Sequence, residues 1–119
     1  IADRTADKLE SGALVTGENL GQVASQTIEN MTAIEAAARR VILRPLVTYD
    51  KVETTDLARR IGTFETSILP FDDCCSLFVP RHPTTKARPQ DAENVESRID
   101  VNAIVEAAVA GAERIDVRS

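Results

Sequence analysis

A polar loop that begins at a glycine, early in the chain, is the segment best suited to bind a ligand. The apolar run 13–15 predicts a short buried strand, and the sequence then breaks at Gly17 and again at Gly21. Open α/β sheets bind ligands at this place, because the loop lies at the carboxyl end of the strand and a following helix offers unpaired N–H groups. The loop therefore predicts a site for an anion or a nucleotide, with these polar side chains on it: Glu18, Gln22, Ser25 and Gln26.

An ordinary turn between a strand and a helix explains the same spacing. In that alternative Asn19 caps the helix, and the glycines serve only the turn. Glu18 also has two possible roles. As a carboxylate beside a polyphosphate it would need a cation between them, and otherwise it would position a loop N–H or a basic group.

The adjacent cysteines Cys74 and Cys75 are the second feature with chemical potential. A thiolate is the reactive species, and it needs positive surroundings. The preceding Asp72 and Asp73 oppose thiolate formation, whereas a later basic segment would favour it if the loop folds back: Arg81, His82, Lys86 and Arg88. Each cysteine alternatively serves as a small buried hydrophobe. Two cysteines and one histidine do not supply the four ligands of a structural zinc site, so we expect no metal.

Alternation of strand and helix patterns predicts an α/β fold with a βαβ unit, whose two strands should be parallel. Residues 63–90 carry four of the five prolines and predict a long structured loop. We expect the elements in this order: helix 2–10, strand 13–16, helix 20–39, strand 41–43, helix 51–61 capped by Asp50 or Thr48 and ended by Gly62, a short strand near 76–79, helices 89–98 and 101–110, and an edge strand in the tail 114–118.

Composition narrows the choice of partners and compartment. The chain has 119 residues, which is one domain or less, and contains no tryptophan for stacking bases. Its net charge of −5 opposes a general affinity for phosphate backbones. No apolar stretch is long enough to span a bilayer, and the first residues lack a signal-peptide pattern, so we expect a cytoplasmic protein.

The string Leu-Val-Thr-Gly-Glu-Asn-Leu-Gly-Gln-Val-Ala-Ser-Gln-Thr at 14–27 is more specific than its glycine spacing. It resembles the corresponding run of the ThiI family of tRNA 4-thiouridine synthases, which are also linked to thiamine biosynthesis. The likeness continues in order through further motifs: Leu43-Arg44-Pro45-Leu46, Tyr49-Asp50-Lys51, 57–63, Asp73-Cys74-Cys75 and Pro83-Thr84-Thr85-Lys86. The family's Ser-Gly-Gly-x-Asp-Ser pyrophosphatase loop and its N-terminal RNA-binding region have no counterpart. The resemblance therefore implies that residues 1–119 are the C-terminal portion of the family's ATP-pyrophosphatase domain. The fold that it implies is α/β, half of a Rossmann-like parallel sheet with flanking helices.

The resemblance implies that Gly17 and Gln26 contact ATP, with Mg²⁺ presumed in the intact enzyme, and that Glu18 and Gln22 are weaker candidates. It also implies that Cys74 or Cys75 hands sulfur to an adenylated uridine at position 8 of tRNA. The neighbouring prolines favour Cys74 in that alignment, and the choice stays open. A cysteine desulfurase is the expected sulfur donor, and a thiamine sulfur-carrier protein is a possible further partner.

Three basic residues, Arg81, Lys86 and Arg88, could contact a phosphate of tRNA, which is the functional interpretation. In the alternative they lie in a solvated loop, and their positive charges balance the negative charges of nearby acidic residues. We expect the chain by itself to be inactive and to self-associate through uncovered strand edges. The rival hypothesis is a non-catalytic adenine-nucleotide-binding or persulfide-carrier module.

Overall fold

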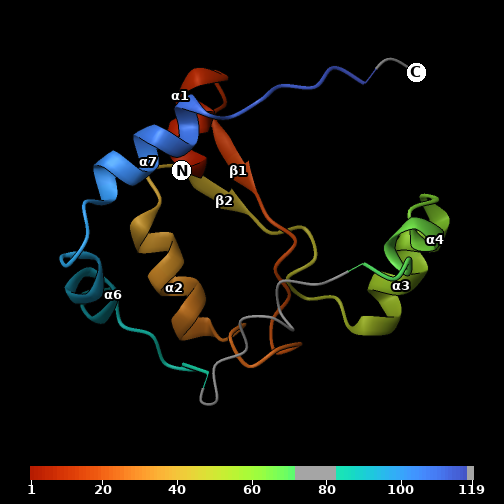
Figure 1. Cartoon of the computed structure of the whole chain (residues 1–119). Coiled ribbons are helices and arrows are strands. Elements are labelled where there is room, and N and C mark those ends of the chain that lie inside the picture. Colours follow the sequence, from red (N-terminus) through yellow and green to blue (C-terminus); the bar gives the residue numbers. More distant parts are fainter. Residues whose placement is uncertain (72–82, 118–119) are drawn as a thin grey trace.

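The computed structural model describes residues 1–71 and 83–117, arranged as two short parallel strands with helices around them (Figure 1). The elements are α1 (Ala2–Lys8), β1 (Ala13–Val15), α2 (Ile28–Ala37), β2 (Val41–Leu43), α3 (Lys51–Arg60), α4 (Phe64–Ser67), α6 (Pro89–Glu96) and α7 (Val101–Ala110). No helix in these ranges is long and apolar enough to cross a membrane.

The two strands confirm the predicted parallel pairing. Leu14 lies opposite Ile42 in the ladder, and the chain between the strands passes through α2, as a parallel connection requires. Ile42 is buried, whereas Val41 is 62% exposed. Pro45, which cannot donate to a ladder, follows β2 closely. The carboxyl ends of both strands therefore lie at one edge of the sheet.

The predicted start of the helix at Leu20 is wrong, because α2 begins only at Ile28. Gly21 has a φ of 77°, a left-handed conformation that no α-helix accommodates, and its N–H donates to the Gln26 carbonyl at 2.8 Å. Thr27 is the true N-cap, and its hydroxyl accepts from the Asn30 N–H. The apolar spacing from residue 20 continues the helical period by coincidence, so the polar loop is eight residues longer than expected.

The helix α3 has the ends that the sequence predicts. Asp50 caps it, and Asp50 and Glu53 exchange hydrogen bonds with each other's backbone N–H in a capping box. Gly62 follows the helix with a φ of 77°, and its N–H donates to the Arg59 carbonyl. The apolar side chain of Val52 is 67% exposed, so this helix does not bury it.

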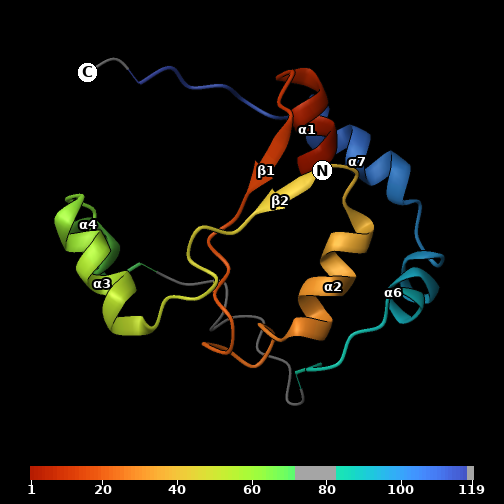
Figure 2. The same cartoon turned by 180° about the vertical axis from the view of Figure 1, so that it is seen from behind.

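Two further expectations fail in the second half of the chain. The helix α4 occupies part of the segment 63–90 that was predicted as loop, with the Arg59 guanidinium over the Phe64 ring. The tail 112–117 forms no strand, and Val117 is 90% exposed. The expected strand near 76–79 lies outside the described residues. In both views α3 and α4 form a pair set apart from the helices around β1 (Figures 1 and 2).

Little of the described chain is buried. Its buried apolar side chains are Ala6, Met31, Ile42 and Val109. α1 packs on β1 and on α7, where the Lys8 ammonium donates to the Val109 carbonyl, and α2 packs on α6. Polar contacts must therefore fix much of the arrangement.

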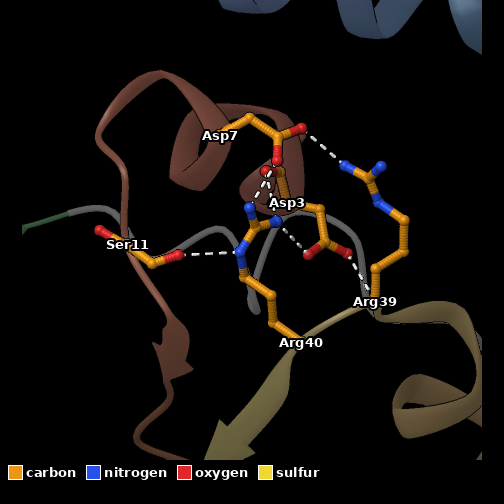
Figure 3. A network of polar contacts seen from close by, with 5 residues as sticks. All are labelled: Asp3, Asp7, Ser11, Arg39 and Arg40. Atoms are coloured by element: carbon orange, nitrogen blue, oxygen red, sulfur yellow. Dashed lines mark hydrogen bonds and ion pairs between the residues drawn. The ribbon is translucent and has the colours of Figure 1, made fainter.

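An ionic cluster fastens α1 to the turn before β2 (Figure 3). The Arg40 guanidinium contacts the carboxylates of Asp3 and Asp7 and the carbonyl of Ser11, and its side chain is 19% exposed. Arg39 donates from its backbone N–H to Asp3 and from its guanidinium to Asp7. The backbone hydrogen bond from Arg39 is the main reason that the pKa of Asp3 lies below its usual value, and the hydrogen bond from Arg40 does the same for the pKa of Asp7.

Because both carboxyl pKa values are lowered by folding, the cluster stabilises the fold above the ordinary carboxyl pKa of 3.8, and this stabilisation is lost as the pH falls through the lowered values. We expect Arg40→Met to lower the melting temperature of the intact protein by a few degrees at pH 7, followed by circular dichroism. The difference from wild type should shrink steadily below pH 3.8. Arg114→Met, at an exposed tail residue, is the matched control. A difference that grows on acidification would contradict this assignment.

Candidate nucleotide and RNA site

The loop after β1 lies against the loop after β2, at the carboxyl ends of both strands. The Leu20 N–H donates to the Val47 carbonyl at 3.0 Å. Asn19, only 8% exposed, donates from its side-chain amide to the carbonyls of Leu46 and Tyr49. Asn19 thus joins the two loops and does not cap a helix, so that alternative is wrong. This edge is where parallel sheets place their ligands.

Arg44 connects three parts of this edge. Its Nε donates to Glu18 Oε2 at 2.8 Å, and its Nη1 donates to Glu35 Oε2 of α2 at 2.6 Å. The Thr16 hydroxyl donates to the same Glu18 oxygen. The hydrogen bond to Glu35, and then that to Glu18, raises the pKa of Arg44, so the guanidinium stays charged. Of the two roles predicted for Glu18, the structure shows contact with a basic group. Arg44 Nη2 is buried without a partner among the described residues.

The two glycines of the loop serve different purposes. Gly21 is required for the turn because of its positive φ. Gly17 has no such requirement, and no atom of the described residues lies within 4 Å of where a Cβ would stand. The described residues therefore leave space beside the Gly17 backbone, where the sequence analysis predicts a ligand contact.

The glutamines of the loop also differ. Gln22 is exposed, whereas Gln26 is half-buried just before the N-cap of α2. Gln26 Oε1 is a buried atom with no hydrogen-bond partner in the described part of the chain. A buried acceptor without a partner is costly, so a ligand N–H donor would stabilise it.

The basic segment 83–88 runs past the beginning of α2 (Figures 1 and 2). Asn30 donates to the carbonyls of Ser25 and Thr84, and Thr27 donates to the carbonyl of Thr85. These contacts bring the segment that carries the exposed Lys86 and Arg88 next to the polar loop 17–26, the candidate site for a nucleotide, which is called the nucleotide loop below. Arg81, Cys74 and Cys75 lie outside the described residues. Sequence reasoning missed the roles of the polar side chains that assemble the site: Asn19, Thr27, Asn30 and Arg44. Asn30 lies outside the family motifs, and the other three lie within them.

Two parallel strands joined through a helix, with a polar loop and a basic segment at their carboxyl edge, define an α/β domain with a ligand site at the end of its sheet. The family model of the thiamine biosynthesis protein ThiI matches residues 1–101. The chain belongs to the ThiI family.

Curated relatives and a solved structure agree with this family. A "Probable tRNA sulfurtransferase" of Finegoldia magna is 48% identical over 118 residues, which is 99% of this chain and 30% of the relative. Proteins of the same name from Macrococcus caseolyticus and Bacillus velezensis are 50% and 47% identical, over 98% and 100% of this chain and 29% and 30% of theirs. The chain thus spans about 30% of the length of these relatives.

The solved structure is titled a crystal structure of a 4-thiouridine synthetase–RNA complex with bound ATP. Its TM-score is 0.85 at 40% identity, and the match covers 92% of this chain and 29% of that one. The predicted fold class, half of an α/β Rossmann-like sheet, is confirmed by this match.

Proposed function

We propose that the intact protein is a tRNA sulfurtransferase that converts the uridine at position 8 of tRNA to 4-thiouridine. The observation that carries the proposal is the likeness to the 4-thiouridine synthetase–RNA complex with bound ATP, together with the polar edge of the sheet in this chain. Residues 1–119 would be the C-terminal portion of its ATP-pyrophosphatase domain. A cytoplasmic location, where tRNA is modified, belongs to the same proposal, as does a role in sulfur transfer for thiamine synthesis.

ATP fits the residues at the nucleotide loop. Gln26 Oε1 is a buried acceptor that needs a donor, which the exocyclic amine of adenine supplies, and Gly17 leaves its backbone open. Glu18 is engaged by Arg44, so its contribution is to hold the loop in place, and the exposed Gln22 is a peripheral contact. ATP, accompanied by Mg²⁺, provides the adenylyl group that turns the uridine oxygen into a leaving group.

The reaction then proceeds in three displacements. The uridine O4 attacks the α-phosphorus of ATP, a bond from oxygen to phosphorus forms, and pyrophosphate leaves. The terminal sulfur of a persulfide on Cys74 or Cys75 attacks C4, and AMP departs with the oxygen. The second thiol attacks the protein-bound sulfur, which releases the thiolated uridine and leaves a disulfide that a cellular thiol reductant must reduce. A cysteine desulfurase would load the persulfide.

The basic segment is the proposed RNA contact. Lys86 and Arg88 are exposed beside the nucleotide loop, and with Arg81 they would bind phosphates near the reacting uridine. The net charge of −5 opposes a general affinity of residues 1–119 for RNA, so we assign the local positive segment to positioning the RNA phosphates.

The proposal is tested by incubating the intact protein with tRNA, ATP, a cysteine desulfurase and cysteine. The expected product is 4-thiouridine, measured by mass spectrometry of digested tRNA, with release of AMP. Persulfide loading without adenylation would instead favour the carrier module.

We also propose that residues 1–119 alone are inactive and self-associate, as the exposed Val15 and Val41 of the strands suggest.

The variant Gly17→Ala tests whether the open backbone at position 17 serves ATP binding and not folding. A methyl group at position 17 meets no atom of the described chain, so we expect an unchanged melting temperature. We expect ATP affinity to fall by roughly tenfold, about 1.4 kcal/mol, since the methyl group blocks close approach of the ligand to the backbone. Gly12→Ala is the matched control, because position 12 is equally open and lies before β1. ATP binding that is unchanged in a titration of the intact Gly17→Ala protein would contradict the assignment.

A further inference from the structure

A single buried carboxamide joins the nucleotide loop to the basic segment. Asn30, 8% exposed, donates from Nδ2 to the Ser25 carbonyl at 2.9 Å and to the Thr84 carbonyl at 2.7 Å. Its Oδ1 accepts from the Ala87 N–H at 2.8 Å. Both donors and one acceptor site of this amide are therefore used, and no other residue type of this size offers the same set.

Thr27 adds a second link between the same segments. Its hydroxyl accepts from the Asn30 N–H at 3.2 Å, which caps α2, and donates to the Thr85 carbonyl at 2.7 Å. The side chains of Asn30 and Thr27 contact backbone atoms of Thr84, Thr85 and Ala87. They therefore hold this stretch of backbone independently of its side chains.

Among the described residues, the basic segment has few other contacts apart from its continuation into α6, which packs on α2. Residues 83–86 and Arg88 are exposed, and only Ala87 is half-buried, so little apolar surface holds the segment. The side chains of Lys86 and Arg88 form no ion pair within the described part of the chain. Together with that link to α6, the hydrogen bonds from Asn30 and Thr27 place the two positive charges relative to Gln26.

We infer that Asn30, assisted by Thr27, is the positioning residue that fixes the basic segment against the nucleotide loop and so sets the register of the RNA phosphates relative to ATP. This inference rests on the proposed function, because it assigns a purpose to the proposed RNA contact. Asn30 touches neither substrate. It acts through the backbone of residues 84–87.

Asn30→Asp in the intact protein is the sharpest variant. It keeps an oxygen to accept from the Ala87 N–H and replaces the two donors with a carboxylate oxygen that faces the Ser25 and Thr84 carbonyls. We expect the half-saturating tRNA concentration to rise about tenfold, with a clearly smaller change for ATP. Asn94→Asp, on the exposed surface of α6, is the matched control and should behave as wild type.

A double-mutant cycle distinguishes positioning from general damage. If Asn30 acts through the basic segment, the tRNA penalty of Asn30→Asp should largely disappear in a protein that already carries Lys86→Ala and Arg88→Ala. Additive penalties, or a change confined to ATP, would overturn the inference while the proposed RNA contact stands. A Lys86→Ala and Arg88→Ala protein with wild-type tRNA saturation would overturn that contact, and the inference with it.

Thr27 keeps the test decisive if Asn30→Asp lowers the yield of folded protein. Thr27→Val removes the hydroxyl at constant shape, and Thr27→Ser retains it. We expect Thr27→Val to raise the half-saturating tRNA concentration severalfold and Thr27→Ser to restore it. Equal tRNA saturation for the two variants would count against the inference.

Discussion

Replacing Cys74 with serine in the intact protein should abolish 4-thiouridine formation while leaving adenylation of tRNA intact. A serine hydroxyl cannot carry a sulfane sulfur, whereas the nucleotide and RNA contacts proposed above lie on other residues. The two half-reactions are measured separately, 4-thiouridine by mass spectrometry and adenylation by tRNA-dependent exchange of pyrophosphate into ATP. We expect no detectable product and near wild-type exchange.

Cys75→Ser is the natural companion, because the sequence favours Cys74 without excluding its neighbour. Loss of product in Cys75→Ser alone would move the sulfur-accepting role to Cys75. Undiminished 4-thiouridine formation in both variants would rule out the pair. Labelling of the persulfide after incubation with desulfurase and cysteine would then show where sulfur is loaded.

Gln26→Ala should weaken ATP binding by roughly tenfold or more, the cost of losing a hydrogen bond that satisfies a buried acceptor. The melting temperature should hardly change, since Gln26 Oε1 has no partner in the described part of the chain. Isothermal titration of the intact protein with ATP measures the first quantity and circular dichroism the second.

Alanine variants of two other glutamines serve as controls for the effect of Gln26→Ala on ATP binding. Gln22→Ala, at an exposed position of the same loop, should have a smaller effect, and Gln90→Ala, exposed on α6, should have none. Equal affinities for ATP in Gln26→Ala and Gln90→Ala would remove Gln26 from the nucleotide site.

Local sequence patterns predicted the helices and strands whose ends are determined by residues close to them in the sequence. The capping box of Asp50 and Glu53 and the Gly62 termination lie within one or two turns of the helix that they delimit, so the sequence specifies α3 closely. The parallel pairing of β1 and β2 was likewise predictable from two apolar runs separated by a helix.

The site itself depends on contacts between distant residues, which local patterns do not encode. Asn30 contacts Thr84 and Ala87, and Arg44 contacts Glu18, because the fold brings loops together that are 26 to 57 positions apart. The late start of α2 has a different cause. A periodicity argument weighs apolar spacing, and the single left-handed residue Gly21 overrides it.

The ionic cluster on α1 has a consequence for biosynthesis. α1 leaves the ribosome before its anchors do, since Arg39, Arg40 and the Val109 carbonyl are made later. The segment 2–8 therefore gains its ion pairs only after Arg40 has been translated, and it gains the contact with the Val109 carbonyl when α7 emerges.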